Sequence, residues 1–303
     1  MSSDKFLVNE SLVKKVLLLP NSDSHKGQNG KILIIADSPL FHGAGRLSLL
    51  AATETIIGLA SRMNDMVYFC STKENLNFIK KEQESFIGIL REEVDNYLKS
   101  ADVVLVGPGL MREPESTRAE THGERDFSLE ITQKVLSSNK KAVLDAGSLQ
   151  VIKSEDLKNK TKIIITPHRL EMANLFDINS DKLKTSHSNQ FSDIQKVAEI
   201  VFSIAKEYKI TILLKGPVDI IASYTGWLYS PGGNAGMTKG GTGDVLAGVV
   251  ASLYFHCDDP LEVASAASFI LKQASNNLWR DSKWLYNASD LALNISKIIA
   301  DFL

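Results

Sequence analysis

The segment Lys31-Ile-Leu-Ile-Ile-Ala36 is an unbroken apolar run, and runs of this kind decide the fold. A strand that is apolar on both faces is usually buried on both faces, which is typical of parallel sheets covered by helices. Similar runs recur at Met66–Cys70, Val103–Val106, Ala142–Asp145, Ile163–Thr166 and Thr211–Leu214. The sequence therefore predicts an α/β protein with a mostly parallel central sheet.

Helical periodicity fills the intervals between these strands. It covers Arg46–Leu59, Phe86–Leu98, Leu129–Leu136 and Phe191–Tyr208. A hairpin follows, and three more helices end the chain, the last with Ser289 as its predicted N-cap; these elements are Val218–Ala222, Trp227–Tyr229, 244–255, Leu261–Leu278 and Ser289–Phe302. Residues 111–126 are charged and predict an exposed loop or flap. No repeat or linker interrupts the pattern, so we expect one domain over residues 1–303.

The composition is that of an ordinary globular protein and indicates small-molecule ligands. The 303 residues are 44% hydrophobic and 23% charged, and the net charge is -2. Lys and Arg are scattered, so neither a nucleic acid nor a membrane surface is expected as a partner. Cys70 and Cys257 have no metal-ligand spacing and predict buried, reduced thiols. No signal peptide or membrane span is evident in the sequence, and we expect a cytoplasmic protein.

A glycine-rich stretch, Gly232-Gly-Asn-Ala-Gly-Met-Thr-Lys-Gly-Gly-Thr-Gly-Asp244, runs directly into a helical pattern. Backbone N–H groups at a helix start have no intrahelical acceptor, and with the helix dipole they form an anion site for a group such as phosphate. Asp244 stands at this start. Asp is a good N-cap, so capping is the simpler interpretation, but the neighbouring glycines indicate close approach by a ligand. Asp244 is therefore a candidate proton acceptor.

Small and polar residues follow the predicted strands. In open parallel sheets, ligands gather at the carboxyl ends of the strands, so these residues are expected along one edge. They are His42-Gly-Ala-Gly45, Gly107-Pro-Gly109, Asp145-Ala-Gly147, Thr166-Pro-His168 with Glu171, and Lys215-Gly216. Each alone is more simply a turn or a helix entry, but together they predict a groove that holds phosphates or polar ligand groups. The chain lacks GxxxxGK[ST] and a GxGxxG after a strand, which speaks against Walker-type or Rossmann nucleotide binding.

With these blocks in this order, and with Asn234-Ala-Gly-Met237 before the Gly240–Gly248 motif, residues 25–275 closely resemble the NAD(P)H-hydrate dehydratase family. The resemblance implies a ribokinase-like three-layer α/β/α sandwich. It also implies an ADP- or ATP-dependent reaction with Mg²⁺, in which hydrated NADH or NADPH is phosphorylated on its ring hydroxyl and then loses phosphate. Because a standalone dehydratase is expected, ADP is favoured over ATP as the phosphoryl donor.

The resemblance also implies roles for individual residues. Asp244 is the implied general base, with Gly241, Thr242 and Gly243 as the anion hole for the transferring phosphoryl group. Residues implied in nucleotide binding are Lys215, Gly216, Asp219, Gly240 and Gly243, and those implied at the hydrated dinucleotide are Ala44, Gly107, Gly109, His168, Asn234 and Asp244. No protein metal site is expected.

The sequence departs from the family pattern at three places. Gly147 stands where the family usually has a second acidic residue, Pro217 follows Lys215-Gly216, and the 111–126 loop is long. The epimerase domain often fused ahead of the dehydratase is not expected in the roughly 30 residues before the first strand, so epimerisation would need a separate protein. A homo-oligomer, possibly a tetramer, is expected. The alternatives are a ribokinase-like kinase for a small vitamin-precursor alcohol and a nucleotide sensor without turnover.

Overall fold

The computed structural model describes residues 3–17, 21–57, 65–81, 85–112, 121–186 and 190–303, with the backbone alone for 51–57. Within these residues one nine-stranded sheet has the order β3-β2-β1-β4-β5-β6-β7-β8-β9. Its strands are β1 (Lys31–Ile35), β2 (Met66–Ser71), β3 (Ile87–Leu90), β4 (Val103–Val106), β5 (Lys141–Leu144), β6 (Ile163–Ile165), β7 (Thr211–Leu214), β8 (Asp219–Ala222) and β9 (Trp227–Ser230). All neighbouring strands from β3 to β7 are parallel, and β8 is antiparallel to both of its neighbours, β7 and β9. The predicted mostly parallel sheet is confirmed.

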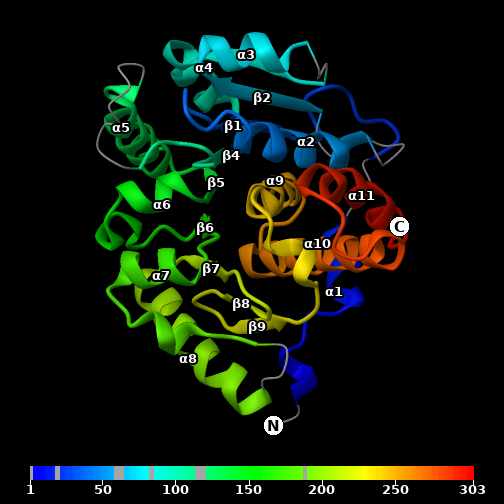
Figure 1. Cartoon of the computed structure of the whole chain (residues 1–303). Coiled ribbons are helices and arrows are strands. Elements are labelled where there is room, and N and C mark those ends of the chain that lie inside the picture. The colour runs from blue at the N-terminus through cyan, green and yellow to red at the C-terminus, as the bar shows by residue number, and fades with distance from the viewer. Residues whose placement is uncertain (1–2, 18–20, 58–64, 82–84, 113–120, 187–189) are drawn as a thin grey trace.

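Helices cover both faces of the sheet, which gives three layers (Figure 1). One face carries α1 (Glu10–Val16), α2 (Ala44–Ile57), α3 (Lys73–Ile79), α9 (Thr242–Tyr254), α10 (Pro260–Ser282) and α11 (Ala288–Ala300). The other carries α4 (Val94–Ser100), α5 (Glu124–Ser137), α6 (Gly147–Val151), α7 (Arg169–Phe176) and α8 (Phe191–Tyr208). Successive strand residues pack alternately into the two cores; Ile32 and Ile34, for example, belong to one and Leu33 and Ile35 to the other.

The register of the sheet brings the strand ends to one edge. Ile35 pairs with Val106, Val106 with Leu144, and Leu144 with Ile165. The residues that follow these strands therefore lie beside one another, as predicted from the sequence. No helix in the described ranges is both long and apolar enough to cross a membrane.

Several local predictions were wrong. The segment predicted as a helix over Phe86–Leu98 holds strand β3, a 3-10 turn at Arg91–Glu93 and only then α4. The strand is short and lies at the sheet edge. The apolar residues Ile87, Leu90, Val94 and Leu98 are three and four positions apart across β3 and α4, which matches a helical period. The helix predicted over Leu129–Leu136 begins earlier, at Glu124, whose carboxylate lies 2.6 Å from Arg91. Residues 113–120 of the predicted loop lie outside the described residues.

Smaller corrections concern helix ends and a thiol. Asn287, rather than Ser289, caps α11, because its side chain accepts from Asp290 N. Helices α1 and α3 were not predicted, and each is a seven-residue helix with a side-chain N-cap. Cys70 is buried, as predicted, whereas Cys257 is only partly buried.

Candidate active site

The start of α9 has the geometry of an anion site. Gly241 is the N-cap, with φ of 94°, and a Cβ there would lie 2.3 Å from Leu47 Cδ1. Only glycine fits both the left-handed backbone and the available space. Thr242 donates its hydroxyl back to Met237 O (2.8 Å) and Lys239 O (3.1 Å), which ties the helix start to the preceding loop. The N–H groups of the first turn have no intrahelical acceptor and are available to an anion.

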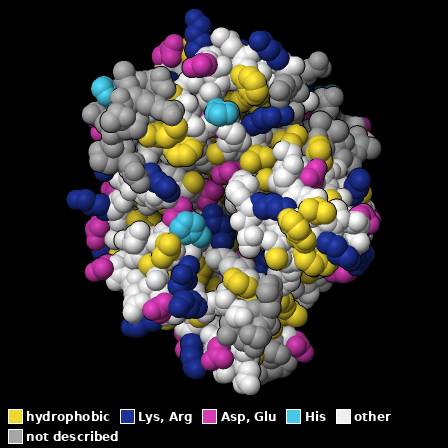
Figure 2. All heavy atoms as spheres, viewed as in Figure 1, with side chains coloured by type: hydrophobic (Ala, Val, Ile, Leu, Met, Phe, Trp, Pro, Cys, Tyr) yellow, Lys and Arg dark blue, Asp and Glu magenta, His cyan; other side chains and the backbone are white. Residues whose placement is uncertain are grey.

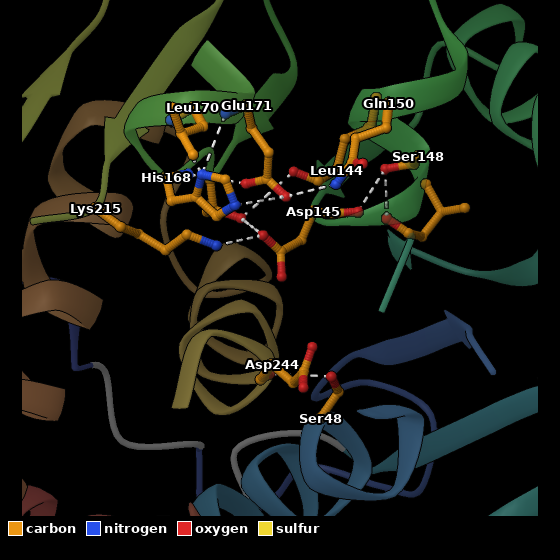
Figure 3. Close-up of polar contacts among 12 residues, drawn as sticks. Ser48, Leu144, Asp145, Ser148, Gln150, His168, Leu170, Glu171, Lys215 and Asp244 are labelled. Carbon is orange, nitrogen blue, oxygen red and sulfur yellow. Dashed lines mark hydrogen bonds and ion pairs between the residues drawn. The ribbon is translucent and has the colours of Figure 1, made fainter. Parts of the chain in front are cut away.

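Asp244 is the third residue of α9, so the capping interpretation is wrong: the cap is Gly241, and no side chain caps this helix. Ser48 Oγ donates to the backbone carbonyl of Asp244 (3.0 Å), while the carboxylate of Asp244 extends into the cleft (Figure 3). Burial, reinforced by the negative charge of Asp145, raises the pKa of Asp244 to about 7, although Lys215 opposes the shift. A carboxylate with such a pKa can accept a proton near neutral pH.

Across the cleft, Lys215 and Asp145 form a buried ion pair. Lys215 Nζ lies 2.7 Å from Asp145 Oδ1, which also accepts the Thr166 hydroxyl at 2.8 Å. Burial alone would lower the pKa of Lys215, but neighbouring carboxylates, Asp145 foremost, raise it above its usual value. The ammonium group is therefore charged and fixed in position. A Cβ on Gly243 would lie 3.2 Å from Lys215 Nζ, so the lysine reaches the first turn of α9.

His168 is the N-cap of α7 and also faces the cleft. Its Nδ1 accepts from Leu170 N and Glu171 N (both 3.1 Å), so this nitrogen carries no proton when the cap is formed. Glu171 accepts from His168 N (2.9 Å) and from Gln150 Nε2 (3.0 Å). A bridge between the backbones of His168 and Lys215 joins this cap to the lysine. His168 thus has a structural role; about half of its side chain is exposed, and its Nε2 lies 3.5 Å from Glu171 Oε1.

The glycines that follow β4 permit close approach of backbone. A Cβ on Gly107 would lie 1.8 Å from Asp145 O, and one on Gly109 would lie 2.8 Å from Phe41 O and 3.1 Å from Ala44 Cβ. Gly107 is therefore required by packing against the Asp145 turn. Gly109 lies against Ala44, the first residue of α2; their role in substrate binding stays a prediction.

A cavity of ≈ 440 Å³ opens beside the anion site. The predicted residues Lys215, Gly216, Asp219, Asn234, Thr242 and Gly243 line it, together with the apolar side chains of Met237, Leu246 and Leu271. Figure 2 shows acidic and basic side chains at the bottom of a central hollow, with a histidine at its rim. A largely apolar pocket with a few charged groups at one end suits a base and its attached phosphates.

Asp219 and Asn234, which line the cavity, are held by hydrogen bonds within the protein. Asp219 accepts from Gly216 N (2.8 Å) and Ser268 Oγ (2.7 Å), and lies 3.3 Å from Lys272 Nζ. The amide of Asn234 donates to Ser275 O (3.0 Å) and accepts from Gly236 N (3.0 Å). Both side chains therefore shape the pocket wall.

Sequence reasoning did not assign roles to three residues of this region. Asp145 was noted only as part of a strand end. Asp37 is fully buried after β1, accepts from Gly45 N (2.7 Å), and has a pKa raised by burial to about 7. Lys272 is buried in α10 and donates to Ser230 O at 2.5 Å. A lysine within the apolar pattern of α10 was the available signal for the last of these.

The arrangement defines a ribokinase-like protein. A solved ribokinase-like superfamily protein from Enterococcus faecalis superposes with a TM-score of 0.77 over 98% of this chain and 95% of that chain, at 19% identity. An ADP/ATP-dependent NAD(P)H-hydrate dehydratase from Bacillus subtilis, co-crystallised with ATP and Mg²⁺, gives a TM-score of 0.74 at 22% identity, covering 98% of each chain. At these identities the two likenesses establish the fold.

The sequence establishes the family. The NAD(P)H-hydrate dehydratase profile matches residues 32–300. The ADP-dependent (S)-NAD(P)H-hydrate dehydratase of Nitrosopumilus maritimus is 32% identical over 297 residues, which are 96% of this chain and 96% of that protein. The chain belongs to the NAD(P)H-hydrate dehydratase family, a family of lyases. The family and fold predicted from the sequence are confirmed.

Proposed function

We propose that this protein is an ADP-dependent (S)-NAD(P)H-hydrate dehydratase that restores NADH and NADPH from their hydrates. The observation that carries the proposal is the Asp244 carboxylate, which projects into the cleft from the first turn of α9 with Lys215 near the same turn. A base, an anion site and a fixed cation then meet at one point, as phosphoryl transfer to a hydroxyl requires. The name of the Nitrosopumilus maritimus relative supports ADP as the donor.

The reaction proceeds in two steps, phosphoryl transfer and elimination of phosphate. Asp244 removes the proton of the ring hydroxyl while the hydroxyl oxygen attacks the terminal phosphorus of ADP, and AMP leaves. The carbon–oxygen bond of the phosphorylated ring then breaks, and phosphate departs with the electron pair and takes up the proton that the adjacent carbon loses as the ring double bond re-forms. Asp244 releases its proton to water. The products are AMP, phosphate and NAD(P)H.

The nucleotide and the substrate occupy different parts of the site in this proposal. The first-turn N–H groups of Gly241–Gly243 and the Lys215 ammonium stabilise the charge of the transferring phosphoryl group. The nucleotide lies in the cavity lined by Gly216 and Asp219, whereas Gly240, also expected at the nucleotide, is not among the residues that line it. The hydrated dinucleotide approaches from the strand-end side, along Ala44, Gly107, Gly109 and His168. Asn234, which the resemblance implied at the hydrate, lines the nucleotide cavity instead.

Mg²⁺ fits this site as a companion of the nucleotide. Across the described residues, no three His, Cys, Asp or Glu side chains form a metal cage. Mg²⁺ is commonly held by one or two carboxylates together with substrate phosphates and water, so a cage is not needed. The second oxygen of Asp145 points toward the Asp244 side of the cleft (Figure 3), and we assign Asp145 as the protein ligand. The ion would offset phosphate charge.

The test is turnover with purified protein. Hydrated NADH is incubated with ADP or with ATP, and recovery of the NADH absorbance band is followed together with release of AMP or ADP and phosphate. We expect recovery with ADP, with one AMP and one phosphate per NADH. ATP-driven recovery with ADP inactive would replace the proposed donor. No recovery with either nucleotide, combined with phosphorylation of a thiazole or pyrimidine alcohol, would establish the small-alcohol kinase instead.

Three further statements stay predictions. We expect a homo-oligomer, to be measured by light scattering. A cytoplasmic location is to be tested by fractionation. Pairing with a separate epimerase is to be tested by adding one to a mixture of hydrate epimers and measuring the additional NADH recovered.

A further inference from the structure

Lys239 lies next to the anion site, where a lysine would usually be assigned to phosphate. Its ammonium group is instead bonded to the protein, because Nζ donates to the carbonyl oxygens of Trp284 and Tyr286. It also lies over both rings, 5.7 Å from the Trp284 centroid and 5.4 Å from that of Tyr286. Two carbonyls and two ring faces hold the cation in place.

The acceptors of Lys239 belong to the connection between α10 and α11. Residues 284–288, which are most of this connection and the first residue of α11, contact the glycine-rich loop at further points. Tyr286 OH donates to Asn234 Oδ1 (2.7 Å) and shares a hydrogen bond with Ser275 Oγ (2.8 Å). The Tyr286 ring fills the space beside Gly236, where a Cβ would lie 2.4 Å from Cε1.

The same connection reaches the N-cap of α9. A Cβ on Gly241 would lie 3.0 Å from Ala288 Cβ. Residues 234, 236, 239 and 241 therefore all abut residues 284–288. Lys239 supplies the charged contact in this series, and it lies between the pocket wall at Asn234 and the helix start at Gly241.

We propose that Lys239 is a positioning residue that fixes the glycine-rich loop against residues 284–288 and thereby sets the direction of the first-turn N–H groups of α9. It contacts neither nucleotide nor hydrate. Its effect on turnover rests on the proposed function, whereas its effect on the loop does not. Loss of the clamp would misplace the anion hole, and a displacement of about 1 Å at such a site can cost a hundredfold in rate.

The experiment compares Lys239→Met with Lys297→Met, which removes an exposed lysine of α11. Amide hydrogen exchange is measured over 232–246 and 283–288 without ligand, ADP affinity by calorimetry, and turnover with hydrated NADH. For Lys239→Met we expect exchange in both segments to rise about tenfold, kcat to fall about tenfold or more, and the ADP Kd to change less than about twofold. Lys297→Met should match the parent protein.

A second variant keeps the test decisive if Lys239→Met folds poorly. Tyr286→Phe removes the hydroxyl bonds to Asn234 and Ser275 but keeps the ring beside Gly236, and it should also loosen both segments. In the double variant the two losses of kcat should not add, because both act on one loop. Unchanged exchange with a tenfold weaker ADP Kd would make Lys239 a phosphate ligand and overturn the proposal, as would unchanged exchange and kcat. Should the parent protein lack dehydratase turnover, exchange alone decides the clamp.

Discussion

Asp244→Asn separates proton transfer from binding and from stability. The substitution keeps the size and position of the side chain but removes its basicity. A general base contributes about 10²–10⁴-fold to rate, so turnover of hydrated NADH should fall by on the order of a thousandfold. The ADP Kd should not weaken, because the first-turn N–H groups and Lys215 are retained and a negative charge near the phosphates is lost.

The pH dependence follows from the position of the carboxylate. Burial raises the pKa of Asp244 to about 7, so kcat/KM of the parent enzyme should rise with pH below 7 and level off above it. The residual activity of Asp244→Asn should lack this rise. Both profiles are measured by NADH absorbance at saturating ADP.

The same pKa shift predicts that Asp244→Asn is more stable than the parent protein. Because the pKa of Asp244 is higher in the folded than in the unfolded state, the ionised carboxylate destabilises the parent fold progressively as pH rises from about 4 to 7, and the full destabilisation is present above pH 7. A shift of about three units corresponds to at most about 4 kcal/mol, and solvent relaxation reduces this to about 1–2 kcal/mol. Asp244→Asn should therefore unfold at a higher temperature than the parent at pH 8, and not at pH 4.

Asp126→Asn is the matched control, because Asp126 also occupies the third position of a helix, α5, but is exposed. It should leave turnover and its pH profile unchanged. Asp244→Asn activity above a tenth of the parent value, or a retained pH rise, would refute the assignment of Asp244 as the base. Unchanged ADP binding with no turnover in either protein would indicate a nucleotide sensor.

Three other predictions concern the surroundings of this base. Asp37→Asn should stabilise the protein by about 1–2 kcal/mol at pH 8 and not at pH 4, because burial raises the pKa of Asp37 to about 7; chemical denaturation at both pH values is the measurement. Gly241→Ala should lower the free energy of unfolding by about 2–4 kcal/mol, from a left-handed backbone and a clash with Leu47, whereas Gly240→Ala, with no atom within 4 Å of its Cβ, should leave stability unchanged. Lys215→Met should weaken ADP binding at least about tenfold and strand the buried charge of Asp145; adding Asp145→Asn should restore stability in thermal unfolding but not ADP affinity in calorimetry.

Much of the fold could be predicted because its signals are local. The strands β4 and β7 have the predicted bounds, since every residue of both is buried and all except Thr211 are apolar. Helix α8 was also predicted with its observed bounds, because one face is buried over 18 residues. The edge strand β3 was mistaken for a helix, because Ile87 and Leu90 continue the helical spacing of the apolar residues of α4. The shared edge of the loops followed from parallel strands alone.

The sequence by itself determined the α/β class, the strand-end groove and the glycine-rich helix start, because each depends on the spacing of residues close together in the chain. Only the tertiary structure decided which charges meet. Lys215 pairs with Asp145 across 70 positions, and Lys239 is bound by carbonyls 45 and 47 positions away. Tertiary burial also set the basicity of Asp244, since its pKa of about 7 depends on side chains from other elements. Desolvation and charge pairing act through space, and the linear order of residues records neither.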